Sequence, residues 1–370
     1  MRNALKLAGT ALVLLLMAFI AVELLVRIFV PQERPLFIAD PLIRTIHRSD
    51  VDTIRKGSEY QAHIRTNTQG FVGDDFIVEK PTGTYRIAAL GDSFTEAFDV
   101  DIDKSYTVLL ERMLTESRKT LQQVYNFGIS GAGSTHELLT YTKYAATYNP
   151  DMVLWQIYLG NDLADDLLLR TDGMGTSTVT EARTGTVRAF LSNNFQSLRF
   201  FIREFEKITA VHDLLARYSI VSRQLDYYDA GRTYPFVYDV YNEDEKTVFS
   251  ENFPLMCDFV REFKRETAVR GDHLAVLLIP AREQVLDEEW NKILDAFPEM
   301  KKKTWNRLQP LEKMRTCLDQ EAVSYVDLYP VFKAAQSAGN ERMYYHTDPH
   351  LNEYGHALVA KSVFDLLSAL

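Results

Sequence analysis

Cysteine is nearly absent from this chain of 370 residues. The two that occur, Cys257 and Cys317, lie far apart and belong to no metal-binding motif. Each falls in a helix-like segment before a predicted strand, where a buried free thiol is the ordinary interpretation. A disulfide between them is the alternative, if the protein folds outside the cytoplasm.

Positive charge is also in short supply. Lys and Arg number 41 against 51 Asp and Glu, so the formal net charge is −10 and the pI is about 5.4. No basic block or stripe stands out, which argues against a nucleic-acid partner. Internal repeats and low-complexity tracts are missing as well. The composition, 46% hydrophobic and 25% charged, is that of a globular protein with a large core.

Residues 7–30 form an almost wholly apolar run, interrupted only by Glu23 and Arg27 near its outer end. A membrane-spanning helix needs about 20 such residues, so residues 1–30 are predicted to be a single-pass anchor in the cell membrane. Arg2 and Lys6 favour a cytoplasmic N-terminus and an extracytoplasmic main domain, periplasmic in a Gram-negative cell. A cleaved signal peptide is the alternative, but the run is long and no small-x-small cleavage site follows it.

The remaining chain divides into residues 31–80, a stalk and short-strand lead-in, and residues 81–370, the main domain. In the main domain, near-continuous apolar strands alternate with amphipathic helices, which predicts an α/β fold with a parallel sheet covered on both faces. The strands are expected at 85–90, 123–127, 152–159, 273–279 and 323–328, and helices at 106–114, 136–148 and 252–269.

Residues 165–250 form a long helical and aromatic insertion after the third strand. Because this segment leaves the carboxyl end of a strand, we expect it near the active face. Most of its aromatic side chains should form its own core, and a minority could line a substrate groove. They are Phe190, Phe195, Phe200, Phe201, Phe205, Tyr218, Tyr227, Tyr228, Tyr234, Phe236, Tyr238 and Tyr241.

A serine follows the first strand of the predicted sheet. The apolar residues 87–90 end abruptly in Gly91-Asp92-Ser93, a pattern typical of a buried strand that breaks into a tight turn before a helix. Reacting groups collect at the carboxyl ends of such strands. Ser93 is therefore either a nucleophile or a simple helix N-cap.

Hydrogen-bond donors follow the next two strands. Gly131 lies in a glycine-rich turn after the second strand, and Asn161 directly follows Gly160 after the third. With the backbone N–H of Ser93, the N–H of Gly131 and the side-chain amide of Asn161 would make a three-donor oxyanion hole. Taken singly, the first is an ordinary turn and the second a helix cap.

A base and an acid lie near the C-terminus. Pro349 biases Asp348 toward extended backbone, so the carboxylate of Asp348 should reach one imidazole nitrogen of His350 and leave the other free as a base. A zinc site of His346, His350 and His356 is the rival interpretation. It is disfavoured because the proline argues against a helical ligand pair and no HExxH motif is present.

These blocks resemble the SGNH, or GDSL-type, hydrolases. The resemblance rests on Gly91-Asp92-Ser93-Phe94, Gly131, Gly160-Asn161-Asp162 and Asp348-Pro349-His350, in that order. With the lead-in Asn67…Gly70-Phe71, which is similar to that of membrane-anchored bacterial members, it covers residues 67–370. The resemblance implies a three-layer α/β/α, flavodoxin-like fold, ester cleavage by a Ser-His-Asp mechanism, and neither metal nor cofactor. The Gly-x-Ser-x-Gly elbow of α/β-hydrolases fits poorly, because position 95 is threonine.

Two departures from the family pattern stand out. The usual last block is Asp-x-x-His, whereas here Asp348 and His350 are separated by one residue. This shorter form resembles the enzymes that acetylate envelope polysaccharides. Ala97 also stands where many members have glycine.

Three functions follow from the resemblance. The first is a serine esterase that hydrolyses a small acyl ester on an extracytoplasmic carbohydrate. The second is an O-acyltransferase that uses the same residues to pass the acyl group to a sugar hydroxyl. The third is a non-catalytic carbohydrate-binding protein, against which the complete set of Ser93, Gly131, Asn161 and His350 argues.

Overall fold

The computed structural model describes residues 2–31, 35–118, 120–171, 194–206, 233–244, 246–339 and 341–369. The chain divides into two units. One comprises Met1–Ala39 with Thr176–Asp226, and the other comprises Asp40–Gly175 with Tyr227–Leu370. Of the predicted insertion aromatics, Phe190, Tyr218, Tyr227 and Tyr228 lie outside the described residues.

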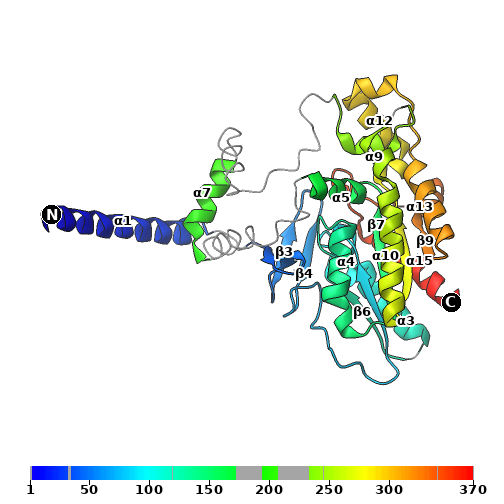
Figure 1. Cartoon of the computed structure of the whole chain (residues 1–370), viewed down its shortest axis with the longest axis horizontal. Coiled ribbons are helices and arrows are strands. Elements are labelled where there is room, and N and C mark those ends of the chain that lie inside the picture. The colour runs from blue at the N-terminus through cyan, green and yellow to red at the C-terminus, as the bar shows by residue number, and fades with distance from the viewer. Residues whose placement is uncertain are drawn as a thin grey trace. The chain divides into compact units, whose positions relative to one another are not determined.

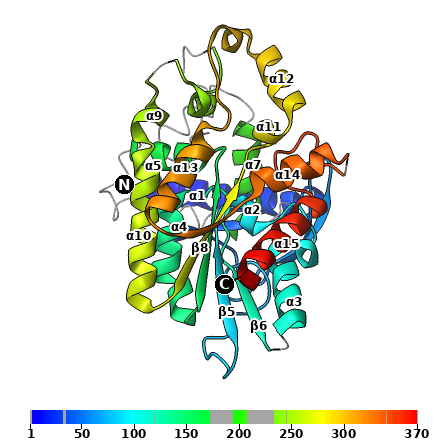
Figure 2. The same ribbon diagram turned by 90° about the vertical axis from the view of Figure 1, so that its right-hand side faces the viewer.

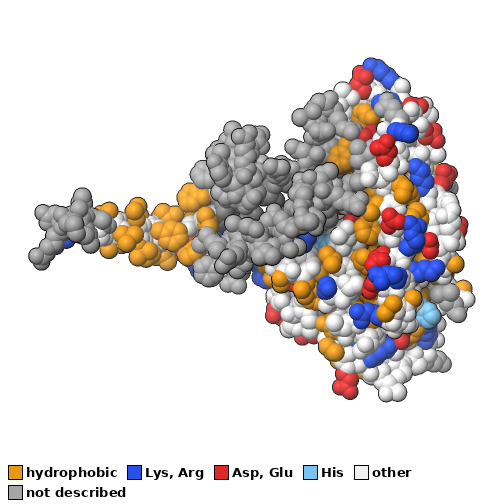
Figure 3. All heavy atoms as spheres, viewed as in Figure 1, with side chains coloured by type: hydrophobic (Ala, Val, Ile, Leu, Met, Phe, Trp, Pro, Cys, Tyr) orange, Lys and Arg blue, Asp and Glu red, His pale blue; other side chains and the backbone are white. Residues whose placement is uncertain are grey.

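The first unit contains the apolar helix α1 (Arg2–Phe29). Its segment Gly9–Phe29 is long and apolar enough to cross a membrane, and its hydrophobic side chains cover its surface (Figure 3). The carboxylate of Glu23 accepts hydrogen bonds from the backbone N–H groups of Gln196 (2.9 Å) and Ser197 (2.8 Å). Glu23 thereby caps the N-terminus of α7 (Gln196–Glu206), a favourable place for an anionic group.

The second unit is built on a five-stranded sheet in the order β6-β5-β7-β8-β9 (Figure 1). All neighbouring strands are parallel, as the uninterrupted apolar runs predicted. The strands are β5 (Tyr85–Leu90), β6 (Gln122–Asn126), β7 (Met152–Tyr158), β8 (His273–Ile279) and β9 (Ser324–Asp327).

Helices cover both faces of this sheet (Figure 2). One face carries α3 (Tyr106–Arg118), α14 (Leu328–Ser337) and α15 (Glu353–Ala369). The other carries α4 (Ser134–Lys143), α10 (Pro254–Arg270) and α13 (Gln309–Gln320). Buried side chains of β5, β7 and β8 pack against α3, α14 and α15 in one continuous core. The predicted three-layer α/β/α fold is confirmed.

One predicted helix is broken in the structure. Residues 136–148 divide into α4 and the short helix η2 (Ala145–Tyr148), because Tyr144 leaves the helical conformation with φ −123° and ψ −65°. The helix predicted at 252–269 is α10, which begins at Pro254, directly after the short helix α9 (Val248–Asn252). Proline has no N–H to continue a helix but fits its first position.

The remaining elements are short. They are β1 (Phe37–Asp40), β2 (Arg44–His47), β3 (Asp52–Lys56), β4 (Gln61–Arg65), α2 (Ser93–Glu96), η1 (Ile102–Lys104), α5 (Asp162–Thr171), η3 (Phe236–Tyr241), α11 (Arg282–Val285), α12 (Asp287–Ala296) and η4 (Pro298–Lys302). Strands β3 and β4 form an antiparallel hairpin. Val72 then pairs with Asn126 at the end of β6, which attaches the lead-in to the edge of the sheet.

The described aromatics at 233–241 pack mainly on tryptophans. Tyr234 contacts Trp305 with ring centroids 5.7 Å apart, and Tyr241 contacts Trp290 at 5.8 Å. The two tryptophan rings are themselves 5.8 Å apart. These rings form a local core with tryptophans that lie outside the predicted insertion.

The two cysteines are joined as a disulfide, so the prediction of free thiols is wrong. Cys257 lies on α10 and Cys317 on α13, with their Cα atoms 5.7 Å apart. The two helices pack side by side on one face of the sheet, which brings together cysteines that are 60 residues apart in the sequence.

Candidate active site

Ser93 is the first residue of α2, immediately after β5. Asp92 caps the helix, because its Oδ1 accepts the N–H of Phe94 at 2.9 Å. Ala97 ends the helix in the left-handed conformation, with φ +60°, which is the position where the family has glycine. The alternative that Ser93 is the helix N-cap is therefore wrong, because Asp92 is the cap and the serine hydroxyl is left for another partner.

The structure brings Ser93, His350 and Asp348 together. Nε2 of His350 lies 2.8 Å from Oγ of Ser93, and Nδ1 lies 2.6 Å from Oδ1 of Asp348. The same Oδ1 accepts the backbone N–H of His350 at 3.0 Å. This local turn, rather than the predicted extended backbone, brings together two residues that are separated by only one.

The carboxylate of Asp348 determines the state of the imidazole. The hydrogen bond from His350 lowers the pKa of Asp348 despite partial burial, so Asp348 is ionised and accepts the Nδ1 proton. Nε2 is then the nitrogen that accepts the Ser93 hydroxyl proton. Burial alone would lower the pKa of His350, but the hydrogen bond to Asp348 and the charges of Asp99, Asp348 and Asp92 outweigh it and raise that pKa.

Two further carboxyl groups lie buried near His350. Burial raises the pKa of Asp92 to about 6 and that of Asp99 to about 7, although the nearby imidazole opposes both shifts. One carboxyl oxygen of each, Oδ2, has no hydrogen-bond partner among the described residues. No motif in the sequence indicated Asp99, because its raised pKa results from burial in the folded chain.

The three predicted oxyanion donors are arranged differently from one another. Gly131 is exposed, with φ +73° and open space where a Cβ would lie. Asn161 instead donates its Nδ2 proton to Oδ2 of Asp165 at 2.9 Å. Its Oδ1 is buried and has no hydrogen-bond partner in the described part of the chain. One N–H of the Asn161 amide is therefore engaged by the first turn of α5, while an amide NH2 group carries two such donors.

A buried pair connects the lead-in to the turn that carries Gly131. Nε2 of His47 lies 2.7 Å from Oε1 of Glu96, and its Nδ1 lies 3.0 Å from the carbonyl of Gly70. The same carboxylate accepts the backbone N–H of Ser130 at 2.9 Å and also the Ser130 hydroxyl. The residue before Gly131 is thus fixed by Glu96 of α2. Only the motif Asn67…Gly70-Phe71 pointed toward this arrangement.

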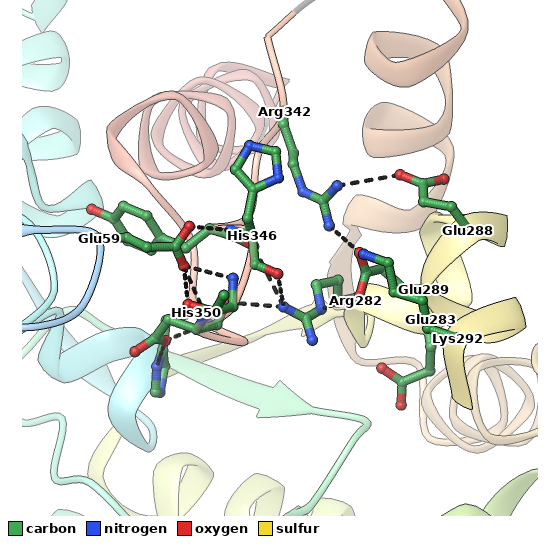
Figure 4. A network of polar contacts seen from close by, with 12 residues as sticks. Glu59, Arg282, Glu283, Glu288, Glu289, Lys292, Arg342, His346 and His350 are labelled. Atoms are coloured by element: carbon green, nitrogen blue, oxygen red, sulfur yellow. Dashed lines mark hydrogen bonds and ion pairs between the residues drawn. The ribbon is translucent and has the colours of Figure 1, made fainter. Parts of the chain in front are cut away.

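Two charged side chains from distant elements contact the segment 345–348 (Figure 4). Glu59 follows β3, and its carboxylate accepts four hydrogen bonds from this segment. The hydrogen bonds from the Thr347 hydroxyl and from the backbone N–H groups lower the pKa of Glu59 to about 2, although desolvation opposes this shift. Arg282, at the start of α11, donates to backbone carbonyls of the same segment. Neither residue lies in a recognisable motif, so no sequence pattern pointed to them.

The three histidines of the rival zinc interpretation have different surroundings. His356 is fully buried on α15, and burial lowers its pKa to about 3. Its Nδ1 accepts the backbone N–H of Tyr106 at 3.3 Å. His346 is exposed in the loop. Among the described residues, no group of three His, Cys, Asp or Glu side chains is arranged to hold a metal ion.

Residues 239–370 match the family model described as "SGNH hydrolase-like domain, acetyltransferase AlgX". This part of the chain is similar to an SGNH hydrolase-like domain. The predicted resemblance is confirmed, and the match covers about a third of the chain. It includes Asp348 and His350 and begins after Ser93, so the serine is joined to the matched segment by the geometry described above.

Several solved structures are similar to this chain at low identity. An alpha/beta hydrolase enzyme from the metagenome of Lake Arreo, Spain, is 13% identical, with 79% of this chain and 98% of that chain covered and a TM-score of 0.41. The lipase/acylhydrolase from Enterococcus faecalis is 12% identical, with coverages of 77% and 96% and a TM-score of 0.41. An acetyl xylan esterase is 14% identical, with coverages of 76% and 98% and a TM-score of 0.40. No curated protein matches the sequence.

Proposed function

We propose that the protein is a membrane-anchored, extracytoplasmic serine esterase of the SGNH type. The observation that carries the proposal is the continuous hydrogen-bonded chain from Oγ of Ser93 through His350 to Asp348. A nucleophile, a base and an orienting acid within hydrogen-bond reach are the requirements for acyl transfer through a serine. The anchor is α1, whose segment Gly9–Phe29 could cross a membrane.

In the proposed reaction, Oγ of Ser93 attacks the acyl carbonyl while Nε2 of His350 takes the hydroxyl proton. The tetrahedral intermediate collapses when His350 passes that proton to the oxygen of the leaving alcohol, which breaks the ester bond. Water then attacks the acyl-serine by the same route, releasing the acid and restoring Ser93. Asp348 keeps Nδ1 protonated and stabilises the imidazolium in both halves of the cycle.

The proposed oxyanion hole uses the backbone N–H groups of Ser93 and Gly131 and the amide of Asn161. One N–H of this amide donates to Asp165, and its second N–H is the donor proposed for the oxyanion. Removing one oxyanion donor typically lowers kcat by about 10²–10³. We therefore expect Asn161→Ala to lower kcat in this range while leaving Ser93 and His350 in contact.

The substrate that we propose is a small acyl ester, such as acetyl, carried by an extracytoplasmic carbohydrate. Two observations support this class: the description of the family that residues 239–370 match, and the short Asp348-x-His350 spacing. The test is hydrolysis of a short-chain aryl ester by the full-length protein in detergent. Ser93→Ala should lower the rate at least 10³-fold, with Ser362→Ala, on the far helix α15, as the control. An unchanged rate in Ser93→Ala contradicts the assignment.

O-acyltransfer is the second candidate, because the matched family is described as an acetyltransferase. The same residues would form the acyl-serine, and a sugar hydroxyl would replace water in the second half of the cycle. The two reactions are separated by product analysis with an acyl donor and an acetyl-free oligosaccharide. Acylated sugar in preference to free acid favours transfer, and free acid alone favours hydrolysis.

A further inference from the structure

The loop at residues 345–350 carries the proposed acid and base but has no regular secondary structure of its own. It runs as a series of bends between Tyr344 and Leu351, which pair with each other across a single bridge. His346 and Thr347 are exposed. A loop without a ladder of backbone hydrogen bonds needs partners from elsewhere to hold one conformation.

Glu59 supplies these partners from one side. It lies in the turn that joins β3 to β4, which is closed by the N–H of Gly57 on the carbonyl of Tyr60 at 3.0 Å. Its Oε1 accepts the N–H of His346 at 2.9 Å. Its Oε2 accepts the N–H of Thr347 at 2.6 Å, the hydroxyl of Thr347 at 2.6 Å and the N–H of Asp348 at 3.0 Å. Three successive N–H groups therefore converge on one carboxylate (Figure 4).

Arg282 supplies partners of opposite charge. Its Nη1 donates to the carbonyls of Tyr345 at 3.4 Å, His346 at 3.2 Å and Asp348 at 3.2 Å. Its Nε lies 3.4 Å from Oε2 of Glu289, which limits its freedom to turn away. Arg282 begins α11, which follows the carboxyl end of β8.

The two contacts meet at Asp348. Its N–H donates to Glu59 and its carbonyl accepts from Arg282, so the peptide groups on both sides of its Cα are held by ionised side chains. The Glu59 carboxylate accepts hydrogen bonds from N–H groups of the loop, and the Arg282 guanidinium donates hydrogen bonds to its carbonyl oxygens. Both sets of hydrogen bonds are strengthened by the charge of the side chain. Holding the backbone of Asp348 in place also helps to keep its Oδ1 within hydrogen-bond distance of Nδ1 of His350.

We propose that Glu59 and Arg282 are positioning residues, which clamp the 345–348 segment so that Asp348 meets His350. The inference rests on the proposed esterase function for its kinetic consequences. If Glu59 positions the loop, the β3–β4 hairpin contributes to the site, although it lies outside residues 239–370 that match the family model. Neither residue touches the reacting atoms, so each acts through Asp348.

The test compares Glu59→Gln, Glu59→Ala, Arg282→Met and Arg282→Lys in the full-length protein. We expect Glu59→Ala and Arg282→Met to lower kcat for an aryl ester by about 10- to 100-fold, as is typical for groups that orient a reacting side chain. KM should change less than kcat. Arg282→Lys should recover part of the loss, because one nitrogen serves all three carbonyls. Glu262→Gln is the charge-matched control, because Glu262 is a partly exposed glutamate on α10 that pairs with Arg265 of the same helix.

The pH profile separates positioning from a general loss of fold. The titratable groups around His350 are Asp348, Asp99, Asp92 and His356, and none is changed in these variants. A looser Asp348 stabilises the imidazolium less, so the pKa of His350 falls and the acid limb of kcat/KM moves to lower pH. A variant that is merely less well folded has the wild-type profile at reduced amplitude.

A second readout does not need turnover. The proton between His350 Nδ1 and Asp348 should give a far-downfield proton NMR resonance in the wild type, which is lost or shifted in Glu59→Ala and Arg282→Met. If the wild type hydrolyses no ester, the proposed function fails and this resonance alone decides the clamp. Folded variants with an unchanged resonance, and an unchanged pH profile where turnover exists, would overturn it. Glu59→Gln provides the milder test if Glu59→Ala does not fold.

Discussion

The imidazole of His350 lies among several carboxyl groups that differ in their state. Asp348 is hydrogen-bonded and has a lowered pKa, whereas burial gives Asp99 a pKa of about 7. Asp99 is 4% exposed, and Tyr345 donates its hydroxyl proton to the backbone carbonyl of Asp99 at 2.8 Å. The carboxyl of Asp99 therefore changes charge in the same pH range as the base that it neighbours.

Replacing Asp99 by asparagine should change the pH dependence of the reaction. The charge of Asp99 raises the pKa of His350, so Asp99→Asn should lower that pKa and move the acid limb of kcat/KM to lower pH. The measurement is kcat/KM for an aryl ester between pH 4 and 9. An unmoved limb in a folded variant would contradict this electrostatic role.

The same substitution should change stability in a predictable direction. In the unfolded chain Asp99 ionises near its ordinary pKa, but in the folded chain only near pH 7, so wild-type stability falls as pH rises from about 4 to about 7. Each unit of raised pKa corresponds to about 1.4 kcal/mol, which gives a loss on the order of 4 kcal/mol. Denaturant unfolding at pH 5 and pH 8 should show a smaller decrease for Asp99→Asn than for the wild type.

Secondary-structure elements outside the sheet have specific roles in this site. The turn after β3 supplies Glu59 to the loop of Asp348, and His47 of β2 supplies a partner to Glu96 of α2. Glu96 in turn fixes Ser130, next to Gly131. The lead-in before β5 thus contacts both the turn that carries Gly131 and the loop that carries Asp348.

Helix α1 is the element that we expect to determine localisation. Its hydrophobic side chains are exposed along Gly9–Phe29, and burial of such a surface in lipid is strongly favourable. The protein should be recovered in the membrane fraction after carbonate washing, with a mass that includes residues 2–30. A soluble form whose N-terminus lies near Pro31 would show that the segment is a cleaved signal peptide instead.

In the molecule as a whole, the features that could be predicted from the sequence are those that a short local pattern determines. Strands β5 and β8 begin and end where the apolar runs at 85–90 and 273–279 predicted. Their carboxyl ends and the loop before α15 bring Ser93, Asp348 and His350 together, as the ordered blocks indicated. These features could be predicted because hydrophobic periodicity and turn chemistry are written in short stretches of sequence.

The features that could not be predicted depend on contacts between distant segments. Glu59 and Arg282 lie more than 60 positions from the loop that they hold, in stretches with no motif. Asp165, one helical turn after Asn161, accepts one of the two protons of the Asn161 amide, a contact that no motif indicated. Contacts of this kind are decided by three-dimensional packing, as is the pairing of Cys257 with Cys317.

Ser93 is proposed to be a nucleophile that His350 activates. Treatment of the full-length protein with a fluorophosphonate probe, followed by peptide mapping of the adduct, tests this proposal. The adduct should form on Ser93, be absent in Ser93→Ala and be strongly reduced in His350→Ala. A folded protein that remains unlabelled, or one labelled at another serine such as Ser130, would contradict the account.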